Sequence, residues 1–339
     1  MNRITIVGMG LIGTSLGLAI KRAELADIEL IGTDMNLNAS GRAKKMGAVD
    51  KTSNSLVASV QGSHMVIIAT PVMAIKEVMS IIGPHLEENC VVTDTGSTKG
   101  VVLKWAKEYL PKTVSFVGGH PMAGKEQSGP EAAEATLFDG ASYCVIPGEG
   151  ARPEAVKSVV TLVEAVRARP LFLSAEEHDS YTAAVSHLPL ILSTMLVTST
   201  TASPAWDEMS KLAASGYKDL SRLASGDPEM SRDICLTNQD QIVHWINEYI
   251  RNLYDLRDKV KEGNGDPIIE VFIKGWEARK KWLAGVPLKK PEVNTYAPTI
   301  GDTAASMFLS DRLAMKKREF MEKTKRDPLK YFRKRQKDQ

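Results

Sequence analysis

Cysteine is scarce in this sequence, with only Cys90, Cys144 and Cys235 among 339 residues. They are odd in number, widely spaced and outside any CxxC pair, which predicts neither a disulfide framework nor a zinc site. The histidines also lack metal-binding spacings such as HExxH, so we expect no metal. Unpaired cysteines are typical of a reducing compartment, and we therefore expect a cytoplasmic protein.

Long apolar runs are missing as well. No uninterrupted stretch approaches the roughly 20 apolar residues that span a bilayer, and glycines at positions 8, 10, 13 and 17 break up the apolar N-terminus. We therefore expect neither a signal peptide nor a membrane segment. With 43% hydrophobic and 25% charged residues, the composition is typical of a folded, water-soluble protein.

Negative charge is sparse near the C-terminus, where residues 312–337 carry twelve Lys or Arg against three Asp or Glu. A basic segment of this kind can bind nucleic acid or an anionic membrane. Few aromatic residues are interleaved with the charges, however, and the Met, Phe and Leu positions fit an amphipathic helix. We therefore expect a solvated helix, and no nucleic-acid or membrane partner.

The length suits two domains, each with its own core. Up to about residue 170, short β-rich runs alternate with helical stretches, which predicts a Rossmann-type, doubly wound α/β domain with a mostly parallel sheet. The expected strands are residues 3–7, 28–33, 65–69, 90–93, 115–117, 142–146 and 170–173, with a helix at 153–168.

Beyond residue 174 the strand patterns stop. Residues 175–199, 203–223 and 228–260 carry apolar side chains at helical spacing, and the GNGDP stretch at 263–267 has the composition of a linker. The predicted domains are residues 1–173 (α/β), residues 174–262 (all-helical) and residues 263–339, a C-terminal extension that includes the basic helix.

A GxGxxG motif, GMGLIG at 8–13, follows the first expected strand and opens a helix. Its glycines allow a tight turn and the close approach of a pyrophosphate to the positive end of the helix dipole. Thr70 and Pro71 follow another strand at the same sheet edge. The candidate cofactor-binding residues are Gly8, Gly10, Leu11, Ile12, Gly13, Asp34, Thr70 and Pro71.

Asp34 ends the second expected strand, 21 residues after Gly13. A carboxylate there would accept hydrogen bonds from an adenosine ribose and repel a 2′-phosphate, which favours NAD over NADP. Arg42 lies close enough in sequence to pair with a phosphate, so NADP use stays open. The alternative interpretation is that the glycines only pack a helix on the sheet and that Asp34 caps a turn.

Two residues at the same edge are candidates for the chemistry. His120 lies in GGHP at 118–121 and has the ring type that takes a hydroxyl proton near neutral pH. Ser97 lies in DTGSTK at 94–99 and could hydrogen-bond a substrate hydroxyl. A structural role is the alternative for both, since a loop histidine is often only hydrogen-bonded and a serine often caps a helix.

The helical half offers two anion-binding candidates. His187 lies in SHLP, where Pro189 should kink the helix and free backbone carbonyls, although a buried core histidine is the simpler interpretation. Arg222 offers a guanidinium fork for a carboxylate. Its alternative role is an ion pair with Asp219 or Asp227.

Taken together, these motifs resemble those of the prephenate and arogenate dehydrogenases over about residues 1–260. The resemblance rests on GMGLIG at 8–13, Asp34, DTGSTK at 94–99, GGHPMAGKEQSG at 118–129, SHLP at 186–189 and GYKDLSRLASGDPEMSRDI at 216–234. It implies oxidative decarboxylation with NAD in tyrosine biosynthesis, a branch of aromatic amino acid biosynthesis. The product would be 4-hydroxyphenylpyruvate from prephenate or tyrosine from arogenate, and the sequence does not choose between them.

The resemblance also implies roles for single residues. His120 would accept the hydrogen bond of the substrate's ring 4-hydroxyl, and Ser97 would orient that hydroxyl. His187 and Arg222 would hold substrate carboxylates. The helical domain would form a homodimer. One departure is Lys125, which precedes Glu126 where family members often have threonine.

Two other functions fit part of the pattern. A β-hydroxyacid dehydrogenase shares this layout, but its GxxxKxxxN pattern is not met, because Lys218 is followed four residues later by Arg222 rather than by asparagine. A non-catalytic NAD-binding regulator would bind the cofactor without reducing it.

Overall fold

The computed structural model describes residues 2–285. Two compact units divide the chain, residues 1–247 and residues 248–339. Every candidate site residue belongs to the first unit. The basic segment 312–337, which we expect to be an amphipathic helix, lies outside the described residues.

The first unit contains an eight-stranded sheet in the order β3-β2-β1-β4-β5-β6-β7-β8. All neighbouring strands are parallel except β6 and β7, which confirms the doubly wound, mostly parallel sheet. Its order reverses between β1 and β4, and ligands of such sheets bind at that point. The strands are β1 Asn2–Val7, β2 Ile28–Thr33, β3 Lys51–Thr52, β4 Met65–Ile68, β5 Val91–Asp94, β6 Ser115–Pro121, β7 Ser142–Pro147 and β8 Arg169–Phe172.

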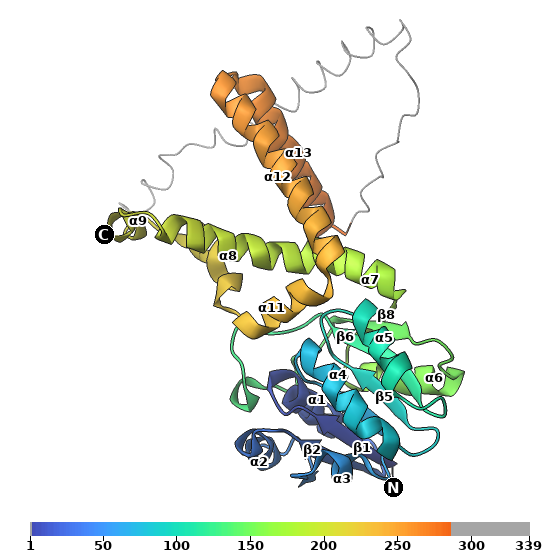
Figure 1. The fold of residues 1–339 in the computed structure, drawn as a ribbon. Helices are drawn as coiled ribbons and strands as arrows, with labels where there is room; N and C mark the ends of the chain where they lie inside the picture. Colours follow the sequence, from blue (N-terminus) through green and yellow to red (C-terminus); the bar gives the residue numbers. More distant parts are fainter. Residues whose placement is uncertain (1, 286–339) are drawn as a thin grey trace, which may run out of the picture. The chain divides into compact units, whose positions relative to one another are not determined.

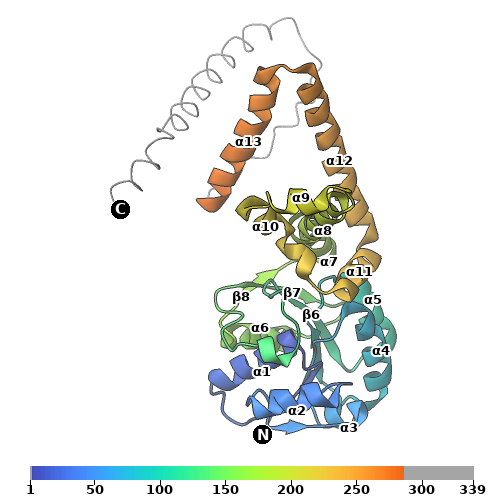
Figure 2. The same cartoon turned by 90° about the vertical axis from the view of Figure 1, so that its left-hand side faces the viewer.

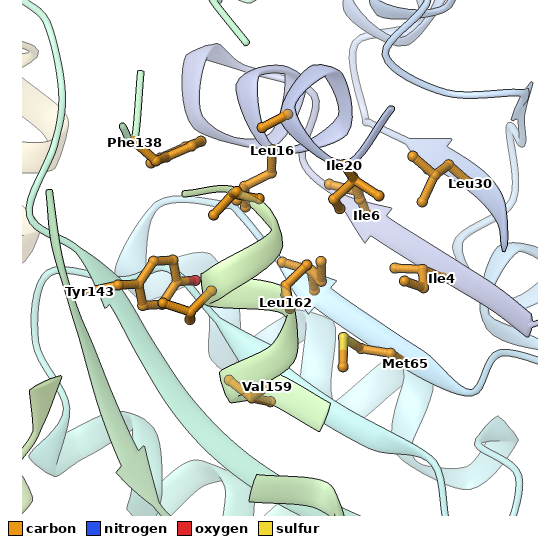
Figure 3. Packing of buried hydrophobic residues seen from close by; sticks show 14 of the residues in the cluster. Ile4, Ile6, Leu16, Ile20, Leu30, Met65, Phe138, Tyr143, Val159 and Leu162 are labelled. Carbon is orange, nitrogen blue, oxygen red and sulfur yellow. The ribbon is translucent and has the colours of Figure 1, made fainter. Parts of the chain in front are cut away.

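Helices cover both faces of the sheet, and each face has its own apolar core (Figures 1 and 2). On one face, Leu16 and Ile20 pack with Leu162 over β1 (Figure 3). The helices of this face are α1 Leu11–Arg22, α2 Leu37–Lys45 and α6 Pro153–Ala165, and those of the other face are α3 Leu56–Val60, α4 Val72–Ile82 and α5 Gly100–Tyr109.

Strand β6 is longer than the expected strand at 115–117. Gly118, Gly119 and His120 continue the ladder by antiparallel pairing with β7. His120 is therefore not a loop residue, as its position after two glycines suggested, but a buried strand residue opposite Cys144. Glycines weaken the strand signal because they have no side chain to pack, and the pairing with β7 outweighs that deficit.

The helical part of this unit begins with a nearly continuous helix, α7 Ala175–Thr182 and α8 Leu188–Thr201, joined by a π-helical stretch at Ala183–His187. The helix therefore departs from α-helical hydrogen bonding just before Pro189, which lacks an N–H to donate. The kink expected from this proline stays a prediction. By length and apolarity, Ala175–Thr201 could cross a membrane. One such helix is weak evidence, since helices of soluble proteins pass the same test.

The remaining helices are shorter than predicted. Residues 203–223 form two helices rather than one, and the expected helix 228–260 is interrupted at Asn238. The observed elements are α9 Trp206–Ser210, α10 Ser215–Ser221, a 3₁₀ turn at Arg222–Ser225, α11 Pro228–Thr237 and α12 Gln239–Glu262, which continues into the second unit.

The second unit contains the rest of α12 and helix α13 Gly265–Leu283. The stretch at 263–267, expected to be a linker, is a tight turn. Gly263 adopts a positive φ of 68°, and the Asn264 side chain caps α13 by accepting from the backbone N–H of Asp266. Glycine followed by an N-capping residue is typical of such a helix–helix turn.

Candidate active site

The glycine loop follows β1 and begins α1. A Cβ on Gly8, which has a φ of +96°, would lie 2.5 Å from the Ala69 carbonyl oxygen, and one on Gly13 would lie 1.9 Å from the Gly8 oxygen. Both positions therefore require glycine for packing. A Cβ on Gly10 would meet no atom of the described part of the chain within 4 Å. Gly10 thus leaves open space beside the start of α1, where Leu11 and Ile12 begin the helix, and a pyrophosphate fits such a place.

Asp34 lies directly beside this loop. One carboxylate oxygen accepts the backbone N–H of Met9 at 2.7 Å, and the other accepts that of Asn36 at 2.7 Å. The carboxylate is held in place with lone pairs left for a ribose hydroxyl. Arg42, the residue that could favour a 2′-phosphate, forms an ion pair with Glu131.

The end of β4 completes this edge. Ala69 and Thr70 are the neighbours that a Cβ on Gly8 would meet, and Pro71 begins the turn into α4. The structure therefore brings Thr70 next to the glycine loop at the switch point of the sheet. The residues present fit a dinucleotide.

His120 is buried in β6, and its Nδ1 lies 2.8 Å from Nε2 of His178 on α7. Burial holds the pKa of His120 well below its usual 6.5, and the nearby His178, Lys99 and His187 act in the same direction. The ring is therefore uncharged at neutral pH and able to accept a proton.

The backbone beside His120 is fixed by a fully buried ion pair between Lys99 and Asp94. The Lys99 ammonium also donates to the Gly119 carbonyl at 2.8 Å, and Asp94 accepts the Gly119 N–H at 3.1 Å. Both charged residues belong to the DTGSTK motif, whose half-buried Ser97 lies in the same turn. The motif thus connects Ser97 to the strand that carries His120.

His187 ends the π-helical stretch. Its Nδ1 lies 3.3 Å from the Asn238 amide nitrogen, which can only donate, so the ring proton belongs on Nε2. Among the described residues, that buried Nε2 has no hydrogen-bond partner. Burial lowers the pKa of His187 to about 4, although the neighbouring Asp179 and the Ser97 backbone favour the charged form. The Ser97 backbone lies near the ring without meeting hydrogen-bond geometry at Nε2, so the N–H of this uncharged ring is open to a substrate oxygen.

Arg222 forms an ion pair with Glu126, not with Asp219 or Asp227. Glu126 lies in the loop that follows β6, so the pair joins the segment SRLAS at 221–225 to the segment that contains His120. The Arg222 side chain remains 60% exposed. Lys125 points to a different partner, since its ammonium contacts Glu134 at 2.5 Å.

Sequence reasoning missed three buried residues of this site, namely His178, Asp179 and Asn238. The three are linked, because Asp179 accepts from the ring of His178 at 2.8 Å and its backbone carbonyl accepts from Asn238 at 2.8 Å. The adjacent His-Asp pair at 178–179 was the available signal, but nothing local indicates that it reaches a strand 58 residues earlier. Among the described residues, no group of three or more His, Cys, Asp or Glu side chains could hold a metal.

Comparison with known proteins explains this arrangement. Residues 16–171 match the family model for the prephenate dehydrogenase nucleotide-binding domain, and residues 174–274 match that for its dimerization domain. Prephenate dehydrogenase of Bacillus subtilis is 35% identical over 289 residues, which cover 85% of this chain and 76% of the relative. The chain belongs to the prephenate dehydrogenase family. The first match begins at residue 16, after the glycine loop at 8–13. The loop is therefore evidence for dinucleotide binding that does not depend on this match.

Solved members of the family share the fold. The prephenate dehydrogenase of Aquifex aeolicus, in complex with hydroxyphenyl propionate and NAD+, is 28% identical with a TM-score of 0.77 and covers 84% of this chain and 98% of its own. Synechocystis arogenate dehydrogenase is 26% identical with a TM-score of 0.70, covering 83% of this chain and 99% of its own. The family thus includes proteins named for each of the two substrates.

Proposed function

We propose that this protein catalyses the NAD-dependent oxidative decarboxylation of prephenate or arogenate, yielding 4-hydroxyphenylpyruvate or tyrosine. The observation that carries the proposal is the buried, uncharged His120, whose Nδ1 is occupied by His178. Its Nε2 is left to act on a substrate hydroxyl. Family membership supports this reaction over that of a β-hydroxyacid dehydrogenase or the role of a regulator without activity.

In the proposed mechanism His120 takes the proton of the ring 4-hydroxyl as that carbon becomes a carbonyl. NAD, when bound, supplies the acceptor for the hydride that leaves the same carbon. The C1 carboxylate then departs as carbon dioxide, the electrons of the broken bond make the ring aromatic, and the ring oxygen takes the proton back from His120 to give the phenol. Aromatisation makes the step effectively irreversible. Ser97 orients the hydroxyl. The protein contributes placement and charge rather than covalent chemistry.

His187 and Arg222 hold the substrate's carboxylates in this proposal. The unpartnered Nε2–H of His187 can donate to an oxygen without bringing a charge into the buried site. Arg222 offers its guanidinium from a more exposed position, where it now pairs with Glu126. A substrate carboxylate would exchange for Glu126 on that guanidinium.

NAD is the preferred cofactor in this proposal. Asp34 sits beside the glycine loop, and Arg42 is engaged by Glu131 rather than free to bind a 2′-phosphate. The protein acts as a cytoplasmic homodimer formed through its helical domain. The match to the dimerization domain supports the assembly, as do exposed apolar side chains such as Val185 and Met195 on the long helix.

The test is an assay of reduced-nicotinamide formation with prephenate and arogenate, each with NAD and with NADP. His120→Asn should lower kcat by about 10²–10⁴, the usual contribution of a general base. Binding of NAD, measured by fluorescence titration, should stay unchanged. Full turnover by His120→Asn, or no activity of the native protein with either substrate, would refute the proposal.

A further inference from the structure

A buried line of hydrogen bonds connects Asp179 through His178 to His120. The carboxylate of Asp179 lies 2.8 Å from Nδ1 of His178, and Nε2 of His178 lies 2.8 Å from Nδ1 of His120. The two imidazole rings meet edge to face, with centroids 5.1 Å apart. His178 is fully buried, and the other two residues are nearly so. Three polar groups from two distant segments thus form a single line that ends at the proposed base.

We propose that His178, anchored by Asp179, is a positioning residue that fixes the tautomer of His120. This inference rests on the proposed function, in which His120 accepts the hydroxyl proton. A neutral imidazole carries its single proton on either nitrogen, and only the form with a bare Nε2 can act as the base. By accepting the Nδ1 proton of His120, His178 selects that form.

The donor and the acceptor of each hydrogen bond in this line follow from Asp179 at its end. Asp179 is acceptor only, so Nδ1 of His178 must donate to it. A neutral His178 then has a bare Nε2, which can only accept, and Nδ1 of His120 must donate to it. The proton on His120 is therefore placed on Nδ1.

The anchor itself is held firmly. The Asp179 carboxylate also accepts the backbone N–H groups of Lys99 and Gly100, each at 2.8 Å, where α5 begins. Burial tends to raise the pKa of Asp179, but hydrogen bonds from His178 and these two backbone groups outweigh it, and the net pKa is lowered. The carboxylate is thus ionised and cannot turn away from His178.

The opposite arrangement would need a doubly protonated His178 that donates to His120. The Lys99 ammonium of this buried region is already paired with Asp94, so among the described residues the extra positive charge would be balanced only by the Asp179 carboxylate. Burying an extra charge is costly. With a neutral His178, both hydrogen bonds between Asp179, His178 and His120 form without an extra buried charge.

Histidine ¹⁵N NMR of the full-length native protein, with and without NAD, tests the tautomer directly. The chemical shift separates protonated from bare ring nitrogens, and spectra of His120→Asn and His178→Gln assign the signals. We expect His120 and His178 each to carry the proton on Nδ1. A proton on Nε2 of His120 would overturn the proposal, and this readout comes from the native protein and needs no activity measurement.

Variants of His178 test the consequence for turnover. His178→Leu removes the acceptor and should lower kcat by about 10- to 10²-fold, part of what a general base contributes, while KM and NAD affinity change little. His178→Gln returns an amide oxygen near the position of Nε2 and should restore most of kcat. The exposed His85, changed to Leu, is the matched control. A purely structural role of His178 would lower thermal stability and leave the His120 tautomer unchanged.

The two proposals fail in different ways. If His120→Asn retains full turnover, the proposed function is wrong whatever His178 does. If His120→Asn is inactive but folded His178→Leu turns over like the native protein, only the role of His178 is wrong.

Discussion

At the scale of single residues, the site contains a fully buried ion pair, Lys99 and Asp94, whose charges cost free energy to remove from water. Both side chains are fully buried, and between them they bind the N–H and the carbonyl of Gly119. Such a pair contributes less to net stability than its short contact suggests, because both charges lose their hydration. Its effect here is to hold the residue before His120 in one place.

We expect Lys99→Met to destabilise the protein by about 3–5 kcal/mol, since it leaves the Asp94 carboxylate buried and unpaired. Chemical denaturation of the native and variant proteins measures this difference. Lys107→Met is the matched control, because the Lys107–Glu149 pair is exposed on both sides and should contribute little. Equal unfolding midpoints for Lys99→Met and the native protein would contradict the expectation.

At the scale of elements, the turn between β1 and α1 separates glycines that pack from one that faces open space. A Cβ at position 13 would collide with the Gly8 carbonyl at 1.9 Å, whereas one at position 10 would meet no atom of residues 2–285 within 4 Å. Alanine at position 13 and alanine at position 10 should therefore have different effects, although both glycines belong to the same GxGxxG motif.

Gly13→Ala should destabilise the protein by about 1–3 kcal/mol through overpacking and should also weaken NAD binding, because α1 must move. Gly10→Ala should unfold at the native temperature but bind NAD more weakly, since its methyl group takes space that a pyrophosphate needs. Thermal unfolding without ligand and NAD titration give the two readouts. A Gly13→Ala protein of native stability would show that the helix can shift freely.

At the scale of the whole molecule, buried uncharged histidines make stability depend on pH. The pKa of His187 is lowered to about 4 by burial, from 6.5 in the unfolded chain, and burial also lowers that of His120 well below 6.5. The unfolded state therefore binds more protons between these values, so stability is complete above about pH 6.5 and is lost as the pH falls toward 4.

The His187 shift corresponds to about 3 kcal/mol lost across that range. His187→Asn, which does not titrate, should flatten the dependence by about this amount when unfolding free energy is measured from pH 7 to pH 4. His85→Asn, at an exposed position, should leave the curve unchanged. An unaltered slope in His187→Asn would mean that the ring is not uncharged in the folded protein.

The sequence by itself determined the doubly wound sheet, the glycine loop with Asp34, and the change from strands to helices near residue 174. These features depend on local spacing, because strand and helix periods and turn residues are read within a few positions. It also pointed to His120, Ser97, His187 and Arg222, whose roles stay predictions.

Only the tertiary structure decided what surrounds those residues. It placed His120 inside a strand rather than a loop, joined it to His178 and Asp179, and paired Arg222 with Glu126. These contacts join residues that are far apart along the chain, and their energies depend on burial and geometry that no local pattern records. Polar partners of this kind are chosen by the packing of whole elements, which the sequence specifies only through the complete fold.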